Sequence, residues 1–178
     1  MKIHSIAFII MIFSGSISAN KSIGIDISQQ RLYVYEDKLI LASYPISSSS
    51  FGEGQIENSY KTPLGKHKIL IKIGTNVEKN TIFVSRENMN QVAEIVHERN
   101  NNENDYITSR ILWLDGLEEG HNKGGNVDSF KRYIYIHGTH EEGLIGEKAS
   151  HGCIRMFNND VIELFSYIPE ETEVNIKI

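Results

Sequence analysis

Short runs in which apolar and polar residues alternate, each closed by turn residues, limit what this chain can fold into. Ile23, Ile25 and Ile27 take every second position of the first run, and Leu32 and Val34 repeat the pattern in the next. A period of two places one set of side chains on one face of a β-strand, and closely spaced turns join such strands into an antiparallel meander. The sequence therefore predicts strands at residues 22–28, 31–37 and 39–46.

Further strands and loops are predicted along the rest of the chain. The strands cover residues 67–73, 107–114, 132–138 and 173–178. Segments rich in Ser, Gly, Asn or acidic residues favour turns over regular structure. They are predicted to be loops and cover residues 47–63, 100–105 and 117–129. No internal repeat or low-complexity tract interrupts this order.

A helix is predicted at residues 87–99, which contain neither Gly nor Pro. Val92, Ile95 and Val96 fall at the spacing that places side chains on one face of a helix. A second short helix is predicted at residues 160–167, with an Asn just before it as its N-cap. The two Asn candidates are Asn158 and Asn159. The expected fold class is mainly β, in a single domain with one or two short helices.

The first residues of the chain have the layout of a secretory signal peptide. Lys2 precedes an unbroken apolar run at residues 6–13, and small residues follow up to Ala19. The run is far shorter than the ~20 residues that cross a bilayer core. We therefore expect a signal peptide at residues 1–19, a catalytic domain at residues 20–178, and export to the periplasm or cell envelope. An uncleaved anchor or a buried strand is the alternative.

The charge balance excludes one class of partner. The chain of 178 residues has a net charge of −5, and without Lys2 it carries 17 basic and 23 acidic residues. Nucleic-acid-binding domains usually show a basic stripe, and none is visible here. No second apolar stretch is long enough to cross a membrane, so no stable membrane span is expected after processing.

Cys153 is the only cysteine in the chain. A single cysteine cannot form a disulfide within the chain, and a free thiol is open to oxidation outside the cytoplasm. A structural alternative is a buried cysteine that packs as a small hydrophobe. The neighbouring residues have to decide between a structural and a chemical role.

Residues 137–156 bring three histidines close to this cysteine in sequence. They are His137, His140 and His151, and glycines stand between them. An imidazole that takes the proton of a thiol makes it a nucleophile, and glycines let backbone N–H groups approach a developing oxyanion. A zinc site is a second interpretation, but the spacing matches no usual structural zinc pattern. Packing of these residues in a core is the third.

The segments HGT (137–139) and ASHGCIRM (149–156) resemble the signature of the YkuD-type L,D-transpeptidases. In that signature a His is followed, after a loop, by [S/T]HGC and then an Arg or Asn. KTPLGKHKI (61–69) is similar to another segment of the family, and residues 111–139 are similar to the approach to the catalytic His in its ErfK/YbiS-like branch. The resemblance covers about residues 22–178.

The resemblance implies a β-sandwich-like catalytic domain and a chemistry that needs neither metal nor cofactor. Cys153 would attack the carbonyl of the third residue of a peptidoglycan stem tetrapeptide, releasing D-Ala, and an amine acceptor would resolve the thioacyl-enzyme. His137 would be the general base and later the acid. The backbone of the loop would form the oxyanion site, with Ser150, Gly138, His151 and Gly152 as its residues. Arg155 would bind a substrate carboxylate, with a local ion pair as the alternative.

Other functions remain open at this point. Water in place of the amine would make the protein an L,D-carboxypeptidase or a hydrolase of a protein–wall link, and a non-catalytic wall-binding protein is the alternative from another class. The expected partners are peptidoglycan stem peptides, and a wall-attached protein is a further possible acceptor. Residues 87–105 look longer than a minimal domain of this kind needs, which is typical of a lid or a specificity element.

Overall fold

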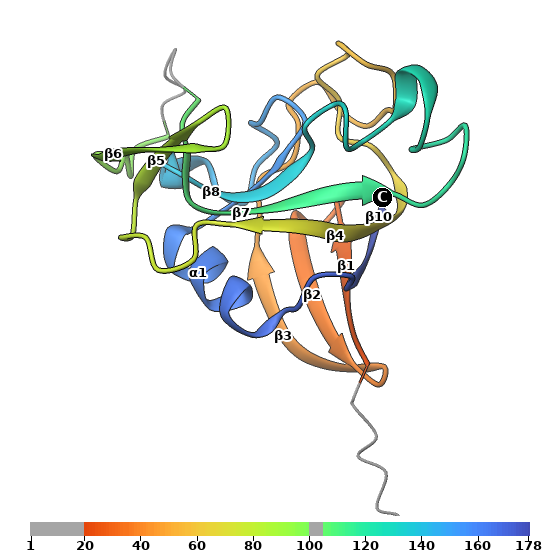
Figure 1. Ribbon diagram of the computed structural model, residues 1–178, viewed down its shortest axis with the longest axis horizontal. Helices are drawn as coiled ribbons and strands as arrows, with labels where there is room; N and C mark the ends of the chain where they lie inside the picture. Colours follow the sequence, from red (N-terminus) through yellow and green to blue (C-terminus); the bar gives the residue numbers. More distant parts are fainter. Residues whose placement is uncertain (1–19, 100–104) are drawn as a thin grey trace, which may run out of the picture.

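The computed structural model describes residues 20–99 and 105–178, which form ten strands and one α-helix (Figure 1). The strands are β1 (Lys21–Asp26), β2 (Arg31–Glu36), β3 (Leu39–Pro45), β4 (Gly65–Ile73), β5 (Thr81–Val84), β6 (Glu87–Val92), β7 (Ile107–Gly116), β8 (Tyr135–Thr139), β9 (Ile154–Met156) and β10 (Glu173–Lys177). The helix is α1 (Asn158–Tyr167), and two 3-10 turns cover Gly125–Val127 and Glu142–Leu144. The predicted signal peptide, and all of the predicted 100–105 loop except Asp105, lie outside the described residues.

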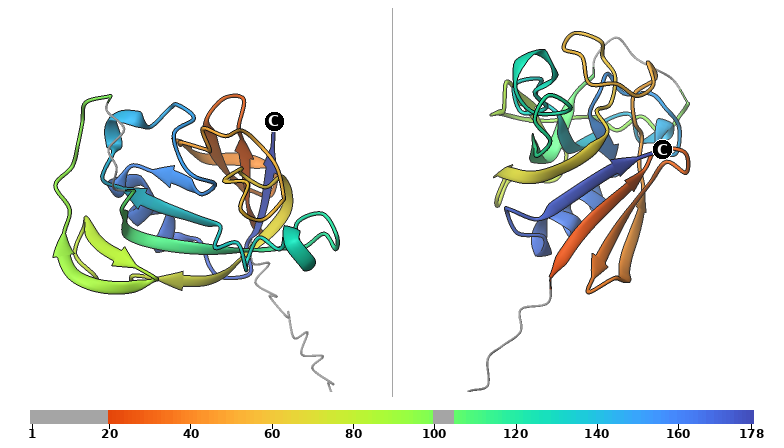
Figure 2. Two further views of the ribbon diagram at one scale, coloured as in Figure 1. Left: turned by 90° about the horizontal axis from the view of Figure 1, so that it is seen from above. Right: turned by 90° about the vertical axis from the view of Figure 1, so that its right-hand side faces the viewer.

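All ten strands belong to one sheet, in the order β3-β2-β1-β10-β4-β7-β5-β6, with β8 paired to β7 and β9 to β8. The sheet is strongly twisted and curls round, so that its two ends face different directions (Figure 2). Its pairs are antiparallel except β1 with β10 and β8 with β9. The mainly β class is confirmed, and within the described residues no helix is long and apolar enough to cross a bilayer.

The N-terminal meander forms as predicted, because its turn residues match the twist of the strands. Asp37 and Lys38 join β2 to β3 with φ angles of 48° and 75°. Two residues with positive φ are what a tight hairpin turn requires if the flanking strands are to keep their right-handed twist. The alternating Ile residues of β1 point into the main core, where Ile23 and Ile25 are 2% and 0% exposed.

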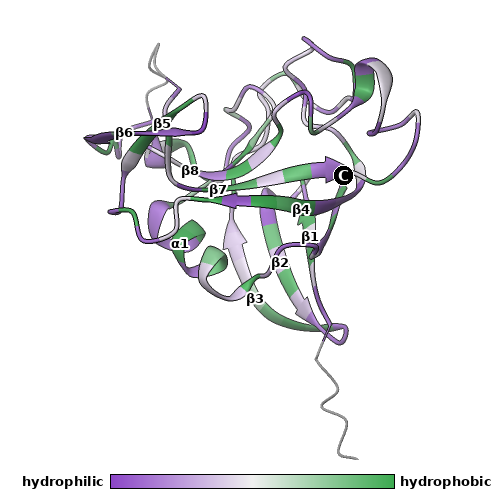
Figure 3. Ribbon diagram, viewed as in Figure 1, coloured by the Kyte–Doolittle hydropathy of each residue, from purple (hydrophilic) through white to green (hydrophobic). Residues whose placement is uncertain are grey.

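Two hydrophobic clusters hold the sheet together. The larger one gathers residues from β1, β2, β3, β4, β7, β8, β9, α1 and β10, and α1 packs on β7 and β8. Apolar residues recur along these central strands, whereas β6 is largely polar (Figure 3). The smaller cluster consists of Phe83, Ile111, Trp113 and Tyr135, with Cys153 packed at its edge.

The helix predicted at residues 87–99 is wrong. Residues 87–92 form β6, which pairs with β5 as a hairpin and is exposed at every position. The apolar residues at helical spacing from Val92 onwards do not share a buried face, since Val92 is 51% exposed. Backbone hydrogen bonds hold the rest of this segment in an irregular path, from Ala93 to Asn80 and from Val96 to His140.

The predicted C-terminal helix is confirmed, but its predicted cap is wrong. Phe157 is the N-cap residue, no side chain caps the helix, and Asn158 is already its first residue. The Asn158 amide is used elsewhere. Its Oδ1 accepts hydrogen bonds from Thr108 Oγ1 (2.7 Å) and Ser109 Oγ (2.6 Å), and its Nδ2 donates to the Thr139 carbonyl (2.7 Å). These contacts tie α1 to β7 and β8.

Candidate active site

The side chains of β8 and of Ile134 just before it point alternately to the main core and to the opposite face. Ile134 and Ile136 belong to the larger cluster and are 3% and 0% exposed. Successive residues of a strand point to opposite faces, so Tyr135 and His137 share the other face. The alternation visible in the sequence therefore delivers the imidazole of His137 to the face away from the main core.

Strand β9 repeats this division beside β8. Ile154 and Met156 are fully buried in the larger cluster, which places Arg155 on the opposite face. The two strands are parallel, with His137 opposite Arg155 and Ile136 opposite Ile154. Cys153 lies directly before β9 and two residues before Arg155, so the strand alternation brings it to the same face as His137. Strand pairing thus gathers the predicted nucleophile and base in one place.

The thiol of Cys153 lies against the chain that enters β8. Its Sγ accepts a hydrogen bond from the Tyr135 N–H at 3.4 Å and donates one to the Tyr133 carbonyl at 3.3 Å. Burial raises the pKa of Cys153 to about 12, although the Tyr135 N–H acts in the opposite direction. At neutral pH the resting group is a protonated thiol, so a base has to take its proton.

His137 is held in the form that such a base requires. Its side chain is buried, and Nδ1 lies 2.7 Å from the Gly138 carbonyl. A carbonyl only accepts hydrogen bonds, so Nδ1 carries the hydrogen and Nε2 has its lone pair free. Burial lowers the pKa of His137 to about 4, which keeps the imidazole neutral at pH 7. A side chain at Gly138 has no room, since a Cβ would lie 2.5 Å from Asn158 Oδ1.

The loop before Cys153 is fixed through its carbonyl groups. Ser150 Oγ donates to the Cys153 carbonyl at 2.6 Å, and Thr62 Oγ1 donates to the Gly152 carbonyl at 3.0 Å. Gly152 has a φ of 123°, a conformation that disfavours any side chain. Thr62 itself accepts a hydrogen bond from the Ser49 N–H at 3.1 Å. The segment around Thr62 therefore supports the loop, a role that the sequence resemblance alone did not identify.

The serine run at residues 47–50 was predicted only as loop, yet it pairs with the catalytic loop like an extra strand. The Ser47 N–H donates to the Arg155 carbonyl, and the Arg155 N–H donates to the Ser47 carbonyl, both at 2.9 Å. The Ser50 N–H donates to the Ser150 carbonyl at 3.0 Å. These bonds satisfy the backbone of β9 on the side that β8 does not cover.

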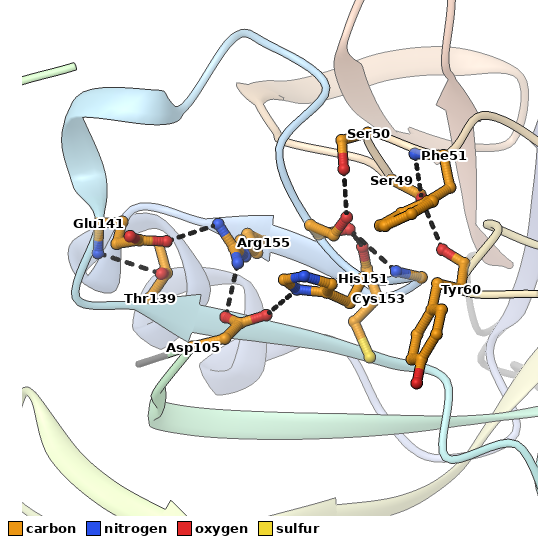
Figure 4. A network of polar contacts seen from close by, with 12 residues as sticks. Ser49, Ser50, Phe51, Tyr60, Asp105, Thr139, Glu141, His151, Cys153 and Arg155 are labelled. Carbon is orange, nitrogen blue, oxygen red and sulfur yellow. Dashed lines mark hydrogen bonds and ion pairs between the residues drawn. The ribbon is translucent and has the colours of Figure 1, made fainter. Parts of the chain in front are cut away.

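Arg155 is the buried centre of an ion network (Figure 4). Its side chain is 0% exposed, and Nη1 lies 2.9 Å from Oε2 of Glu141, which is also buried. Its Nη2 forms an ion pair at 2.6 Å with Oδ1 of Asp105, whose other oxygen lies 2.9 Å from His151 Nδ1. Burial alone would raise the pKa of Asp105, but the Arg155 charge holds it below its usual range. This is the geometry of the local ion pair that was the alternative for Arg155.

Asp105 and Glu141 were not among the predicted site residues. Asp105 ends the acidic and Asn-rich run at residues 100–105, and Glu141 follows directly after the HGTH segment. Glu141 follows His137 within a few residues, and sequence analysis could have used this carboxylate as a signal. The partner of each carboxylate, however, depends on which segments the fold brings together.

A hollow of about 270 Å³ opens beside the catalytic loop. Its lining residues are Glu57, Asn58, Tyr60, Lys131, Arg132, Tyr133, Ile134 and His151. The ring of His151 lies 5.8 Å from that of Phe51 and 6.1 Å from that of Tyr60, so aromatic side chains form one rim. Since the Tyr133 carbonyl accepts the hydrogen bond of the Cys153 thiol, this hollow reaches the sulfur's immediate neighbours.

Arg132 closes the wall of the hollow. Its guanidinium donates to the carbonyls of Gln55 and Lys61, both at 2.7 Å, and thereby fixes the loop that carries Tyr60.

Within residues 20–99 and 105–178, no group of three or more His, Cys, Asp or Glu side chains is placed to hold a metal ion. The third histidine, His140, is 5% exposed and packs 4.8 Å from the ring of Tyr106.

The family model of the YkuD L,D-transpeptidase catalytic domain matches residues 20–176. The chain belongs to this family. Among curated relatives, YkuD of Bacillus subtilis (strain 168) is 45% identical over 60 residues, which cover 31% of this chain and 37% of that protein. YqjB of the same organism is 51% identical over 45 residues, 25% of this chain and 26% of that protein. The matched region thus spans well under half the length of these curated relatives.

Solved structures of L,D-transpeptidases share the fold. L,D-transpeptidase 3 from Mycobacterium tuberculosis, in complex with a faropenem-derived adduct, gives a TM-score of 0.56 at 15% identity, covering 90% of this chain and 61% of that one. An L,D-transpeptidase from Mycobacterium smegmatis gives 0.53 at 17% identity, covering 90% and 59%. The predicted family and the predicted fold of an L,D-transpeptidase catalytic domain are therefore confirmed.

Proposed function

We propose that this chain is a peptidoglycan L,D-transpeptidase that works through a thioacyl group on Cys153. The observation that carries the proposal is the arrangement of the thiol and the His137 imidazole. His137 lies in β8, Cys153 directly precedes its parallel partner β9, and the Gly138 carbonyl fixes the imidazole with Nε2 unprotonated. Membership of the family supports peptidoglycan as the substrate class, and we propose its stem peptides as the acyl donor.

The first half-reaction starts from two neutral groups, because burial disfavours both the thiolate and the imidazolium. As the sulfur attacks the carbonyl of the third stem residue, Nε2 of His137 takes the thiol proton. The resulting tetrahedral oxyanion collapses and the bond to D-Ala breaks. The leaving amine takes the proton from His137, which leaves a thioester on Cys153 and a neutral imidazole.

The oxyanion is proposed to bind the backbone around Cys153. A peptide unit is planar, so a hydrogen bond that fixes a carbonyl also fixes the N–H on the opposite side of the same unit. Thr62 holds the Gly152 carbonyl and therefore directs the Cys153 N–H away from Thr62. Donors that are fixed before the reaction stabilise a developing charge better than donors that must first reorient.

In the second half-reaction an amine attacks the thioester, His137 takes the proton of the amine, and as the carbon–sulfur bond breaks it passes that proton to the leaving Cys153 sulfur. The products are a new amide bond and a free thiol. With water as the acceptor, the same residues would give an L,D-carboxypeptidase or a hydrolase that releases a wall-attached protein. The acceptor, and not the nucleophile or base, separates these activities.

The test is incubation of the protein spanning residues 20–178 with purified tetrapeptide muropeptides, followed by mass analysis. A cross-linked dimer with loss of one D-Ala is the expected product, whereas tripeptide alone would identify the hydrolase. Cys153→Ala should form neither. Ser43→Ala, on β3, is a matched control that should behave as the wild type. No product from the wild type with any donor would contradict the proposal.

A covalent probe tests the nucleophile separately. One solved structure with this fold carries a faropenem-derived adduct, so a β-lactam of that type or a carbapenem is a suitable reagent. The wild type should gain the mass of one adduct and Cys153→Ala none. An adduct on Cys153→Ala would place the nucleophile elsewhere. Activity that is lost on chelation and restored by zinc would instead favour the metal-site interpretation.

Export is proposed on the sequence of residues 1–19 alone. The N-terminus of material secreted by an expressing cell should lie near Asn20, and intact-mass analysis measures this directly. A full-length chain that stays in the cytoplasm would contradict the proposed location in the periplasm or cell envelope.

A further inference from the structure

The hairpin of β5 and β6 places a cation above the aromatic side chains next to the thiol. Ser85 and Arg86 form its two-residue turn, with φ angles of 49° and 71°. The Arg86 guanidinium lies 5.0 Å from the ring centre of Trp113 and 4.8 Å from that of Tyr133. Trp113 is itself stacked on Phe130 at 4.2 Å, so the platform below the cation is rigid.

Arg86 differs from the other arginines near the site in what its N–H groups bind. Arg155 is committed to two carboxylates, Arg132 to backbone carbonyls of the 54–61 loop, and Arg110 to the Ser109 carbonyl. For Arg86, no carboxylate among residues 20–99 and 105–178 lies within ion-pair distance. Contact with the Tyr135 hydroxyl raises the pKa of Arg86, so it stays charged.

A guanidinium carries five N–H donors, so the contacts of Arg86 with the Tyr135 and Tyr133 hydroxyls leave donors for a further ligand. The planar fork of these donors matches the two oxygens of a carboxylate, and stacking reduces the freedom that would be lost on binding. Arg86 is half-buried, so it is partly desolvated yet open on one side. A half-buried cation without an acidic partner is a site for an anion that comes from solution.

The position of Arg86 relates this anion to the reacting sulfur. The Tyr133 carbonyl accepts the thiol hydrogen bond, and the Tyr135 N–H donates to Sγ. The side chains of these same two tyrosines contact Arg86. Tyr133 also lines the 270 Å³ hollow, so a residue in contact with Arg86 belongs to the wall of the space next to Cys153.

We propose that Arg86 is the specificity-determining residue that binds a carboxylate of the acyl-donor peptide, the role first assigned to Arg155. The inference rests on the proposed function, because a stem peptide supplies the carboxylate. The terminal carboxylate of the leaving D-amino acid is the expected ligand, since it is separated from the scissile carbonyl by only one residue. The carboxylate on the side chain of the third residue is the other source of the same chemistry.

Binding to a protein that cannot turn over tests this without requiring catalysis. In a Cys153→Ala background, the affinity for a stem tetrapeptide should fall about 10- to 100-fold on Arg86→Gln, the range for a hydrogen bond to a charged group. Arg86→Lys, which keeps the charge but loses the fork, should fall in between. Arg31→Gln is the control, because the Arg31 side chain donates to Ser43 within the β2–β3 pair and has no other side-chain hydrogen bond or ion pair among residues 20–99 and 105–178.

Two modified peptides identify the ligand, one with a terminal carboxamide and one with a carboxamide on the third side chain. The Cys153→Ala protein that keeps Arg86 should lose affinity for one of them, and adding Arg86→Gln should cost nothing further with that peptide. Additive losses with both peptides, or unchanged binding in Arg86→Gln, would overturn the proposal. Thermal melting of each variant excludes misfolding as the cause. The muropeptide assay above fails or succeeds independently of this result.

Discussion

Two arginines near Cys153, Arg155 and Arg86, have opposite surroundings. On one side, Arg155 is fully buried and surrounded by carboxylates that the protein supplies, Asp105 and Glu141. On the other side, Arg86 rests on aromatic rings and has no carboxylate partner in the part of the chain described here. Sequence position favours Arg155 as the substrate-binding cation, because it stands two residues after the nucleophile. We propose Arg86 for that role, because it is the one of the two without a carboxylate partner among the described residues.

The difference follows from the energetics of burying charge. A buried guanidinium loses its hydration and is stable only if opposite charges and hydrogen bonds replace it, so the protein must complete such a group itself. A half-exposed guanidinium keeps part of its hydration and needs no internal partner. Charges that a site uses for ligands are therefore to be sought at its rim, and the fully buried ones beside it hold its elements in place.

The largest effect is expected at His137, which lies opposite Arg155 in the paired strands. His137→Ala removes the proposed base, and such a loss typically lowers a rate by ~10²–10⁴-fold. His151→Ala should lose less, because the His151 ring contacts Asp105 and the aromatic rim and its loop is held by Ser150 and Thr62. Single-turnover acylation of both variants across pH measures the ratio. A slower His151→Ala, with His137→Ala retaining a normal pH profile, would reverse the two roles.

The next effect compares the two arginines through stability. Arg155→Met removes the cation that faces the buried carboxylate of Glu141 and the partly exposed carboxylate of Asp105, and breaking a buried pair such as Arg155–Glu141 costs about 3–5 kcal/mol of unfolding free energy. Urea denaturation measures it. Arg31→Met, on the surface of β2, is the control and should change stability by less than about 1 kcal/mol. Equal effects of the two variants would remove the basis of the comparison.

What the sequence could predict of the fold depended on whether a local pattern also found a partner in space. The alternation in β1, β2 and β8 was a reliable guide, because each strand buries one face in the larger cluster. The helical spacing at residues 87–99 was not, since the apolar residue Val92 faces solvent and the turn at Ser85 and Arg86 forms a hairpin instead. Periodicity predicts a structure only where the patterned face is covered.

For the site, sequence could identify groups but not their pairings. The Cys–His arrangement was predictable because both residues lie in one short stretch of chain with its own signature. The partners of Arg155 could not be found in this way, because Asp105 and Glu141 come from different segments that only the sheet brings together. The same holds for Thr62, whose hydroxyl supports a loop 90 residues away.

A third prediction extends the comparison to a buried histidine far from Cys153. His67 is fully buried, with Nε2 2.9 Å from Ser129 Oγ, and burial lowers its pKa to about 4 from an ordinary value near 6.5. A lowered pKa means that the unfolded chain binds the proton first. The stabilisation is complete above pH ~6.5 and is lost as the pH falls towards 4, by ~1.4 kcal/mol per pH unit for each such histidine.

Urea denaturation of the wild type and of His67→Gln at several pH values between 7 and 4 measures this slope. In the variant, the slope of the unfolding free energy with pH should decrease by the contribution of one proton. The contribution of His137, whose pKa is also lowered by burial, should remain. Stability that does not change over this range, or a slope that His67→Gln leaves unaltered, would show that burial does not keep His67 neutral.

The smallest effect completes the comparison on the open side. Arg86→Met removes a cation that no described carboxylate needs and keeps an unbranched side chain over Trp113 and Tyr133. What is lost is a partly exposed cation–π contact, about 0.5–1 kcal/mol. The unfolding free energy should therefore change by no more than about 1 kcal/mol, while donor binding weakens as proposed above. A loss as large as that of Arg155→Met would mean that Arg86 holds the hairpin in place, and its charge would then be part of the fold and not of the substrate site.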